Sequence, residues 1–289
     1  MNAKEAIATV KHLPPISPAG MRLIHLLNRD AADNDEIVFA LKTDMALTAK
    51  LLGVCNSSCF AFDEPVSSVD QALLMLGHQN TLRLVLALSF GDAMEMPLPG
   101  YAVAANELWR HSLTAAAAAE IAVTSGLDLP INPQLAFTTG LLHDIGKLVL
   151  GQVITADTQA EIRETIHQHR LSCSEAERQI LGTDHAEVGA ILLEKWRLPE
   201  EIIEGVAHHH QPQVDSNTGL SVVAHLADCL AHLSSAAPGW DAYAVRVSDL
   251  VTDKINITPS TLERMIIAVR ESCGRLGLGA ENAVEYHSK

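Results

Sequence analysis

His143 and Asp144 stand side by side in an apolar run, Gly140–Leu150, and their types are the first in the chain to suggest chemistry. Burying an imidazole beside a carboxylate costs several kcal/mol unless a partner satisfies both groups, and a metal ion is such a partner. If the run is one helix, Lys147 follows one turn later and places a cation beside the same pocket. The pair alone leaves a second interpretation open, a satisfied His-Asp pair in the core that binds nothing.

Two further residues of this kind lie within predicted apolar helices. His111 falls on the face that apolar residues define at steps of three and four. Asp228 lies in a largely buried helix expected over residues 221–233, where an aspartate requires a cation or strong donors. His225 and His232 lie on a similar side of that helix, and they fit either outer donors to a site or ordinary core residues.

His185 is expected in the first turn of a helix, because Asp184 and Glu187 have the spacing of a capping box. A histidine at a helix start is often an ordinary surface residue. Gly189, one turn further on, favours the functional alternative, since a glycine there lets a second backbone approach the helix.

Three successive histidines end the next predicted helix, which Pro199 opens. Counting about 100° per residue around the axis places His209 and His210 on the apolar face and His208 on the opposite one. Two imidazoles on one buried face are hard to satisfy without a shared partner, so both are candidate ligands.

Not every histidine in this half of the chain is a candidate. His167 and His169 lie among Gln, Arg and Glu within residues 155–180, which we expect to be amphipathic and to face solvent. Surface histidines are the simpler interpretation of both.

Together the candidates supply five imidazoles and two carboxylates: His111, His143, Asp144, His185, His209, His210 and Asp228. This set exceeds what one tetrahedral ion binds and suits two five- or six-coordinate ions, completed by water and a bridging carboxylate. Nitrogen and oxygen donors without a thiolate indicate iron, manganese, zinc or nickel, so one or two such divalent ions are expected as cofactors. Two divalent ions would leave a positive pocket, which favours a phosphate-bearing small molecule or a nucleotide as ligand.

The elements that must position these residues are predicted to be helices throughout, so the fold class is all-α, a multi-helix bundle preceded by a smaller helical domain. Residues 1–96 form a series of short helices, with caps at Asp44 and Ser68 and a stop at Gly77, and they cluster no ionisable groups. The Pro-Leu-Pro-Gly sequence that follows cannot continue a helix. We therefore expect an N-terminal helical domain over residues 1–96 and a metal-binding bundle over residues 101–289.

The composition limits the classes of function. The formal net charge of −15 over 289 residues argues against nonspecific nucleic-acid binding, which requires a basic surface. No apolar run approaches the ~20 residues that cross a bilayer, and the first residues lack a signal-peptide core, so we expect a cytoplasmic protein without membrane contact. The five cysteines are scattered and odd in number, which favours reduced thiols.

Several segments resemble the HDOD family, a bacterial signal-output group within the HD superfamily of metal-dependent phosphohydrolases. They are His143–Lys147, which looks like the HD motif itself, and Lys42–Phe60, Ala72–Gly77, Trp109–Ser112 and His208–Pro212. The resemblance covers most of the chain, from about residue 13 to the last helices. It implies an HD-type helical fold and, by similarity to the HD-GYP phosphodiesterases, metal ligands at the seven candidate positions.

The same resemblance implies a metal-dependent phosphohydrolase that acts on a phosphate ester or nucleotide, with Asp144 and Lys147 as catalytic residues and Lys147 contacting substrate phosphate. No Gly-Tyr-Pro follows Gln211-Pro212, so the substrate loop of the HD-GYP enzymes is missing and cyclic di-GMP is not expected as the substrate.

Two alternatives stay open. In the first, the protein is a non-catalytic signal-output module whose metal site is structural or senses a ligand, and whose N-terminal domain binds a signalling protein. In the second, the metal centre only holds a helical bundle together, an interpretation that gives Lys147 no reason to face the centre.

Overall fold

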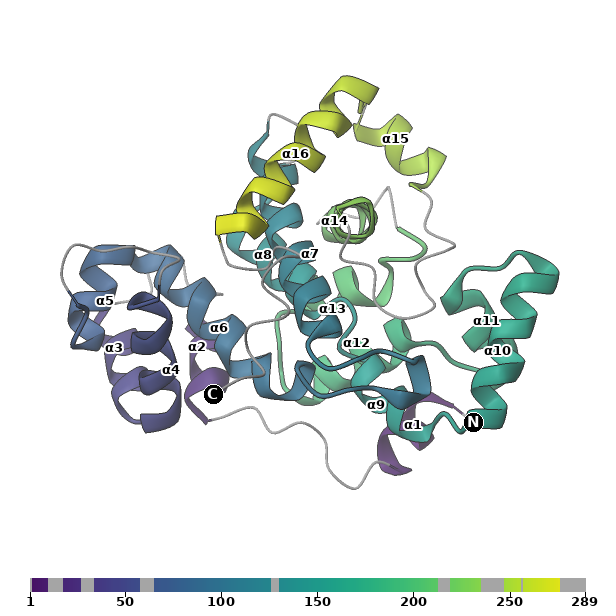
Figure 1. Ribbon diagram of the computed structural model, residues 1–289, viewed down its shortest axis with the longest axis horizontal. Coiled ribbons are helices and arrows are strands. Elements are labelled where there is room, and N and C mark those ends of the chain that lie inside the picture. Colours follow the sequence, from purple (N-terminus) through teal and green to yellow (C-terminus); the bar gives the residue numbers. More distant parts are fainter. Residues whose placement is uncertain are drawn as a thin grey trace. The chain divides into compact units, whose positions relative to one another are not determined.

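The structure, a computed structural model, describes residues 2–9, 18–26, 34–57, 65–125, 130–212, 219–234, 247–255 and 257–275. Within these ranges the regular secondary structure is helical (Figure 1), apart from an isolated bridge between Leu98 and Val103. The predicted all-α class is confirmed. No helix in the described part of the chain is long and apolar enough to cross a membrane.

The chain forms two compact units, one of residues 1–14 and 93–269 and the other of residues 15–92 and 270–289. The larger unit contains α1 (Ala3–Thr9), η1 (Pro99–Tyr101), α7 (Glu107–Thr124), α8 (Pro133–Leu142), α9 (Lys147–Val153), α10 (Ala156–His169), α11 (Cys173–Leu181), α12 (His185–Lys195), α13 (Glu200–Ala207), α14 (Leu220–Leu233) and α15 (Asp249–Ile255). The smaller unit contains α2 (Pro18–Leu26), α3 (Asn34–Lys42), α4 (Met45–Cys55) and α5 (Val69–Leu76). Two helices have residues in both units, α6 (His78–Met94) and α16 (Pro259–Arg275).

These units differ from the predicted domains at both ends of the chain. The first helix, α1, buries Ala3, Ala6 and Ile7 and packs against α9 and α12 of the larger unit, whereas the prediction grouped residues 1–96 together. A helix of seven residues is marginal alone, so the surface that covers its apolar face determines where it belongs. A second division falls after residue 92, a few residues before the predicted boundary, and a third after residue 269, whereas the prediction grouped residues 101–289 together.

Local capping starts and stops the helices of the smaller unit where the sequence predicts. The Asp44 carboxylate accepts a hydrogen bond from the Leu47 amide at 3.0 Å, and the Ser68 hydroxyl accepts one from the Gln71 amide at 3.1 Å. Gly77, with a φ of +76°, ends α5 in a conformation that glycine adopts without strain.

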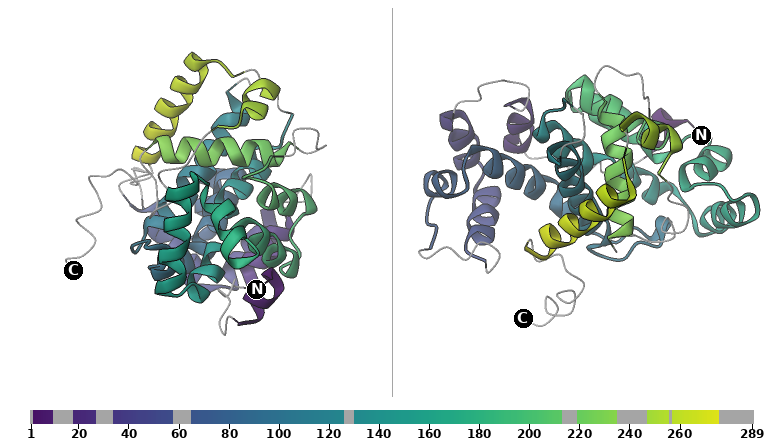
Figure 2. Two further views of the ribbon diagram at one scale, coloured as in Figure 1. Left: turned by 90° about the vertical axis from the view of Figure 1, so that its right-hand side faces the viewer. Right: turned by 90° about the horizontal axis from the view of Figure 1, so that it is seen from above.

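Three helices of the larger unit, α7, α8 and α14, lie side by side (Figures 1 and 2). The alanines of α7 at residues 115–119 are all buried, and Gly140 of α8 lies against them. A Cβ atom at Gly140 would lie 2.7 Å from the Ala115 carbonyl oxygen, so the two backbones are in close contact. Small residues on both helices therefore bring their polar side chains within reach of a common point.

Most of the segment that resembles the HD motif lies in a turn, so the expectation of one helix through it is wrong. α8 ends at Leu142 and α9 begins at Lys147, with His143–Gly146 between them. A Cβ atom at Gly146 would lie 1.9 Å from the His185 carbonyl oxygen and 2.6 Å from the Gly189 amide nitrogen. The chain turns here because the first turn of α12 packs directly on its backbone. The close approach predicted at Gly189 is confirmed, and Gly146 is its partner.

α13 is also shorter than predicted. It ends at Ala207 with His208 as its C-cap, and His209 and His210 follow in a turn. The prediction from helical angles therefore assumed the wrong element. His209 is buried as expected, whereas His210 is half-buried like His208. His210 nevertheless contacts His185, with 2.7 Å between the two Nε2 atoms.

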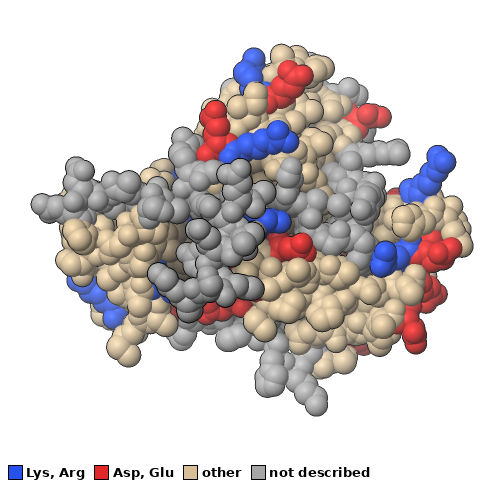
Figure 3. All heavy atoms as spheres, in the orientation of Figure 1, with Lys and Arg blue, Asp and Glu red and all other residues tan. Residues whose placement is uncertain are grey.

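On the face drawn in Figure 3, Lys and Arg lie between acidic and uncharged residues. The net charge is −15, and the scatter of charge on this one face is unlike the basic stripe that binds nucleic-acid backbones.

Candidate metal centre

The larger unit brings all seven predicted ligands together in its interior. They come from α7 (His111), the turn between α8 and α9 (His143 and Asp144), the start of α12 (His185), the turn after α13 (His209 and His210) and α14 (Asp228). All are buried except His210, which is half-buried. Their role as ligands stays a prediction, but their convergence is a property of the fold.

One half of the centre is formed by His111, His143, Asp144 and Asp228. The Nε2 atom of His111 lies 3.1 Å from His143 Nε2 and 3.2 Å from Asp228 Oδ1. Asp144 Oδ2 lies 3.5 Å from the first of these nitrogens and 3.4 Å from the second. Two imidazole nitrogens and two carboxylate oxygens thus face a common point.

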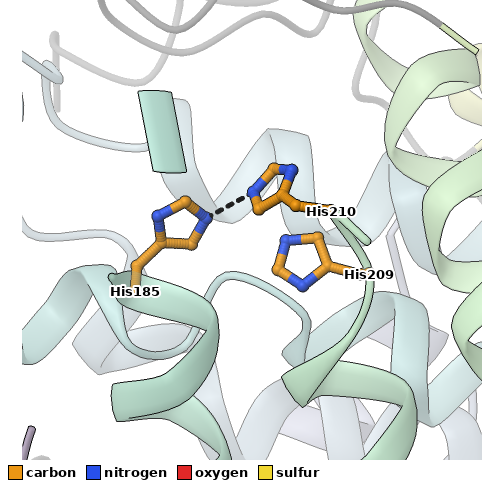
Figure 4. Close-up of side chains that lie close together, drawn as sticks. All are labelled: His185, His209 and His210. Atoms are coloured by element: carbon orange, nitrogen blue, oxygen red, sulfur yellow. Dashed lines mark hydrogen bonds between the residues drawn. The ribbon is translucent and has the colours of Figure 1, made fainter. Parts of the chain in front are cut away.

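The other half is formed by His185, His209 and His210, whose rings lie close together (Figure 4). His185 Nε2 lies 2.7 Å from His210 Nε2, and the rings of His209 and His210 have centroids 4.0 Å apart. Asp144 Oδ1 lies 3.3 Å from His185 Nε2. The two oxygens of Asp144 therefore face different halves, which is the arrangement of a bridging carboxylate.

Backbone carbonyl groups set the orientation of two of the rings. Nδ1 of His143 donates to the Gly140 carbonyl at 2.8 Å, and Nδ1 of His209 donates to the Val206 carbonyl at 2.7 Å. In each ring the Nε2 atom is thereby turned towards the centre, where it can bind a metal ion once it carries no proton. His209 Nε2 is buried and has no hydrogen-bond partner among the described residues.

The donor set fits a metal ion. With bonds of about 2.0–2.2 Å, neighbouring donors on one ion lie about 2.8–3.6 Å apart in octahedral or tetrahedral geometry. The distances among His111, His143 and the two carboxylates, 3.1–3.5 Å, fall within this range. A cation would also satisfy the buried Nε2 atom of His209, for which the described part of the chain offers no hydrogen-bond partner.

Carboxylates raise the pKa of two of the histidines. Burial favours the neutral form of His143, but the carboxylates of Asp144 and Asp228 outweigh it and raise its pKa to about 10. Burial likewise opposes the charged form of His185, and the carboxylates of Glu177 and Asp144 raise its pKa to about 9. Two imidazolium groups therefore balance the buried carboxylates while no cation is bound.

Two other groups of the centre, Asp144 and His209, have lowered pKa values. Burial disfavours the charged form of Asp144, yet the positive charges of Lys147 and His143 hold its pKa well below the usual value. Burial, followed by the charges on His143 and His185, lowers the pKa of His209 to about 3. A neutral His209 beside an ionised Asp144 is in the protonation state that a metal ligand requires.

Lys147 lies beside Asp144, as the sequence suggested, although it opens a new helix. Its side chain is buried, and Nζ donates to Asp144 Oδ2 at 2.7 Å. The same Nζ lies 5.9 Å from the centre of the Tyr101 ring. The lysine therefore adds a fixed positive charge on one side of the carboxylate.

Sequence reasoning missed Glu177, which lies on α11 within the segment expected to face solvent. His167 and His169 on α10 are exposed as predicted, but Glu177 is fully buried, 2.7 Å from His185 Nδ1. A signal was present in the sequence: Cys173 and Leu181, four residues to either side, put Glu177 on an apolar stripe of its helix.

The two histidines of α14 that were left undecided have different roles. Nδ1 of His232 lies 3.0 Å from Asp228 Oδ1, so this ring is an outer partner of a candidate ligand. His225 donates through Nδ1 to the His209 carbonyl at 2.8 Å and accepts through Nε2 from the Ser248 amide at 3.0 Å. It holds the backbone of the histidine turn and does not enter the centre.

The chain is similar to known proteins in sequence and in fold. Residues 13–212 match the HDOD domain. An HDOD domain protein of unknown function from Geobacter sulfurreducens is 21% identical, covers 96% of this chain and 95% of its own, and superposes with a TM-score of 0.70. A candidate phosphohydrolase from Shewanella amazonensis is 22% identical, with 96% and 98% covered and a TM-score of 0.68. At these identities the likeness establishes the shared fold.

Curated relatives match over a shorter region. Ribonuclease Y from Thermus thermophilus is 30% identical over 130 residues, which are 45% of this chain and 17% of that protein. An uncharacterized protein from Treponema pallidum is 24% identical over 179 residues, 61% of this chain and 33% of that protein. The chain thus spans a third or less of the length of these two relatives.

Proposed function

The chain belongs to the HDOD family, and from this premise we propose that it is a signalling protein with a divalent-metal centre that hydrolyses a phosphate ester or nucleotide. The observation that carries the proposal is the position of Asp144. Its two oxygens face two separate groups of imidazoles, while Lys147 holds a positive charge beside it. A purely structural ion needs neither the bridge nor the lysine.

The residues that would hold one or two ions of iron, manganese, zinc or nickel are His111, His143, Asp144, His185, His209, His210 and Asp228. When bound, such ions lower the pKa of a coordinated water and polarise a phosphoryl oxygen. The chain supplies the remaining functions: Lys147 stabilises negative charge on the phosphate, Asp144 holds the two halves of the centre together, and a neighbouring imidazole takes up the proton that is released. His210 is the one half-buried candidate ligand, so we expect a substrate to approach the centre on its side.

Charge supports a phosphate-bearing substrate. The protein as a whole is acidic, with a net charge of −15, so an anion needs a local positive site to overcome repulsion. Two divalent ions and Lys147 would provide it. The match to ribonuclease Y makes an RNA phosphodiester one of the substrates to be tested beside nucleotides and phosphomonoesters.

The test combines metal analysis with a hydrolysis assay. Protein purified without added metal is expected to contain one or two divalent ions and to release product from at least one substrate class. Asp144→Asn should lose the metal and reduce kcat/KM by more than the roughly 10- to 100-fold cost of losing an outer hydrogen-bond partner. The matched control is Asp157→Asn on the exposed first turn of α10, which should retain both properties. If the wild-type protein contains no metal and Asp144→Asn is as stable as the wild type, the proposal is refuted. These residues would then be ordinary core residues that bind nothing.

A second candidate is a non-catalytic signal-output module, and the smaller unit provides an observation in its favour. Met45 and Leu74 are 86% and 85% exposed, and Phe39 is 56% exposed, and a protein partner that binds this unit would cover such apolar side chains. Stoichiometric metal without turnover on any of the three substrate classes would support this candidate over the enzyme.

A further inference from the structure

Glu177 is the most completely hydrogen-bonded carboxylate near the centre. Its Oε2 atom accepts from the backbone amide of His185 at 2.8 Å and from His185 Nδ1 at 2.7 Å. Its Oε1 atom accepts from the Tyr101 hydroxyl at 2.7 Å, with the Cys173 thiol at 3.2 Å. Both oxygens are therefore occupied by donors from three different elements, η1, α11 and α12.

This arrangement determines which nitrogen of His185 faces the centre. Because Nδ1 donates to Glu177, the ring turns Nε2 towards Asp144 Oδ1 at 3.3 Å and His210 Nε2 at 2.7 Å. The backbone bond to the same carboxylate holds the first residue of α12 as well as its ring. A carboxylate behind a metal-bound imidazole fixes the orientation of the ring and increases the basicity of the coordinating nitrogen.

We propose that Glu177 is a positioning residue of the metal centre, which holds His185 Nε2 on the side shared with His210, and that the Tyr101 hydroxyl holds Glu177 in that role. The inference rests on the proposed function, because it requires that His185 bind a metal ion.

Tyr101 links the two ends of this arrangement. Its hydroxyl donates to Glu177, and its ring lies 5.9 Å from Lys147 Nζ, which in turn donates to Asp144. One buried side chain thus touches both the residue behind His185 and the cation beside Asp144. Tyr101→Phe removes only the hydroxyl bond and keeps the ring against the lysine, so it tests the first contact alone.

The experiment is a Co²⁺ titration of the metal-free full chain, followed by the visible absorption bands that report the ligands of each ion. Glu177→Gln should weaken one class of Co²⁺ site by about 10- to 100-fold and alter its band, because the neutral amide is a weaker acceptor for His185 Nδ1. Tyr101→Phe should weaken the same class by a smaller factor. Glu177→Asp, which keeps the charge, should recover part of the affinity.

Glu175→Gln is the matched control, because it makes the same change at an exposed position of the same helix. It should leave the titration unchanged. If Glu177→Gln fails to fold, Tyr101→Phe and Glu177→Asp carry the test.

The outcomes separate the two proposals. Wild-type affinity and wild-type absorption bands in the Glu177 and Tyr101 variants would overturn the positioning role while leaving the metal centre intact. Absence of Co²⁺ binding by the wild-type protein would overturn the proposed function, and the positioning role with it. Weakened Co²⁺ binding in a protein that hydrolyses no substrate would support the positioning role and contradict only the enzymatic proposal.

Discussion

A single methyl group at Gly146 should damage both the fold and the metal centre. This glycine lies in the turn that carries His143 and Asp144, and its backbone touches the start of α12. In Gly146→Ala the new Cβ atom would lie 1.9 Å from the His185 carbonyl oxygen and 2.6 Å from the Gly189 amide nitrogen. Both neighbours are backbone atoms, so a change of side-chain rotamer cannot relieve the overlap.

The size of the effect follows from these distances. Ordinary contact begins at 3.4 Å, so the turn and α12 must separate by about 1.5 Å at this point. Overpacking of this kind costs about 1–3 kcal/mol and occasionally more. We expect about 3 kcal/mol because the neighbours are rigid, which lowers Tm by about 6–12 °C in a unit of this size. The shift also exceeds the ~0.2 Å tolerance of metal–ligand distances, so it should separate His185 from Asp144 as ligands.

Urea and thermal unfolding in a chelator measure the stability, and a metal titration measures the centre. The control is Gly151→Ala in α9, where the new Cβ would lie 3.4 Å from side-chain atoms of Leu98 and Tyr101. That variant should change stability by less than about 1 kcal/mol, since alanine also favours the helix. If Gly146→Ala melts within about 2 °C of the control and binds metal with wild-type affinity, the contact between the turn and α12 is not as close as described.

Four further predictions concern the centre and its surroundings. Because His143 and His185, with pKa values raised to about 10 and about 9, must lose protons to bind an ion, metal affinity should rise between about pH 6 and pH 9. Calorimetry in buffers of different ionisation enthalpy counts the protons released, and a pH-independent affinity would contradict the assignment. Protonated His143 and His185 also stabilise the folded protein without metal, and this contribution is complete below about pH 6.5, the pKa of an unfolded histidine. The free energy of unfolding should therefore fall as the pH rises through about 9 and 10, as urea unfolding in chelator would show. His209→Leu should abolish the rise in Tm that metal produces but lower the metal-free stability by less than about 2 kcal/mol. It loses the bond from Nδ1 to the Val206 carbonyl, but it also removes a buried Nε2 atom that has no partner among the described residues. An equal loss of stability with and without metal would refute this prediction. Burial opposes ionisation of Asp184, but the charge on His185, the helix amide and the Arg178 guanidinium lower its pKa, so its stabilisation is present above about pH 4 and lost as the pH falls through the lowered value. Asp184→Asn should therefore flatten the loss of stability in acid, and an unchanged acid transition would count against the ion pair.

The sequence was a sound guide wherever a structural feature depends on residues close together in the chain. The caps at Asp44 and Ser68 and the stop at Gly77 were predicted correctly because each involves hydrogen bonds or torsions within one helical turn. The helical class followed from the same local patterns. The candidate ligands could be selected by type, because an imidazole or carboxylate on an apolar face needs a partner wherever that face is buried.

Tertiary structure alone determined where those residues lie. The turn at His143–Gly146 exists because the backbone of α12, forty residues away in the chain, occupies the adjacent space, and no periodicity of the turn itself encodes that contact. The sequence predicted that Glu177 belongs to a solvent-facing segment, whereas in the structure α11 places it behind His185. Burial, and with it the pKa and the orientation of each buried ring, depends on packing between distant segments, so the sequence could nominate the participants of this centre but not their arrangement.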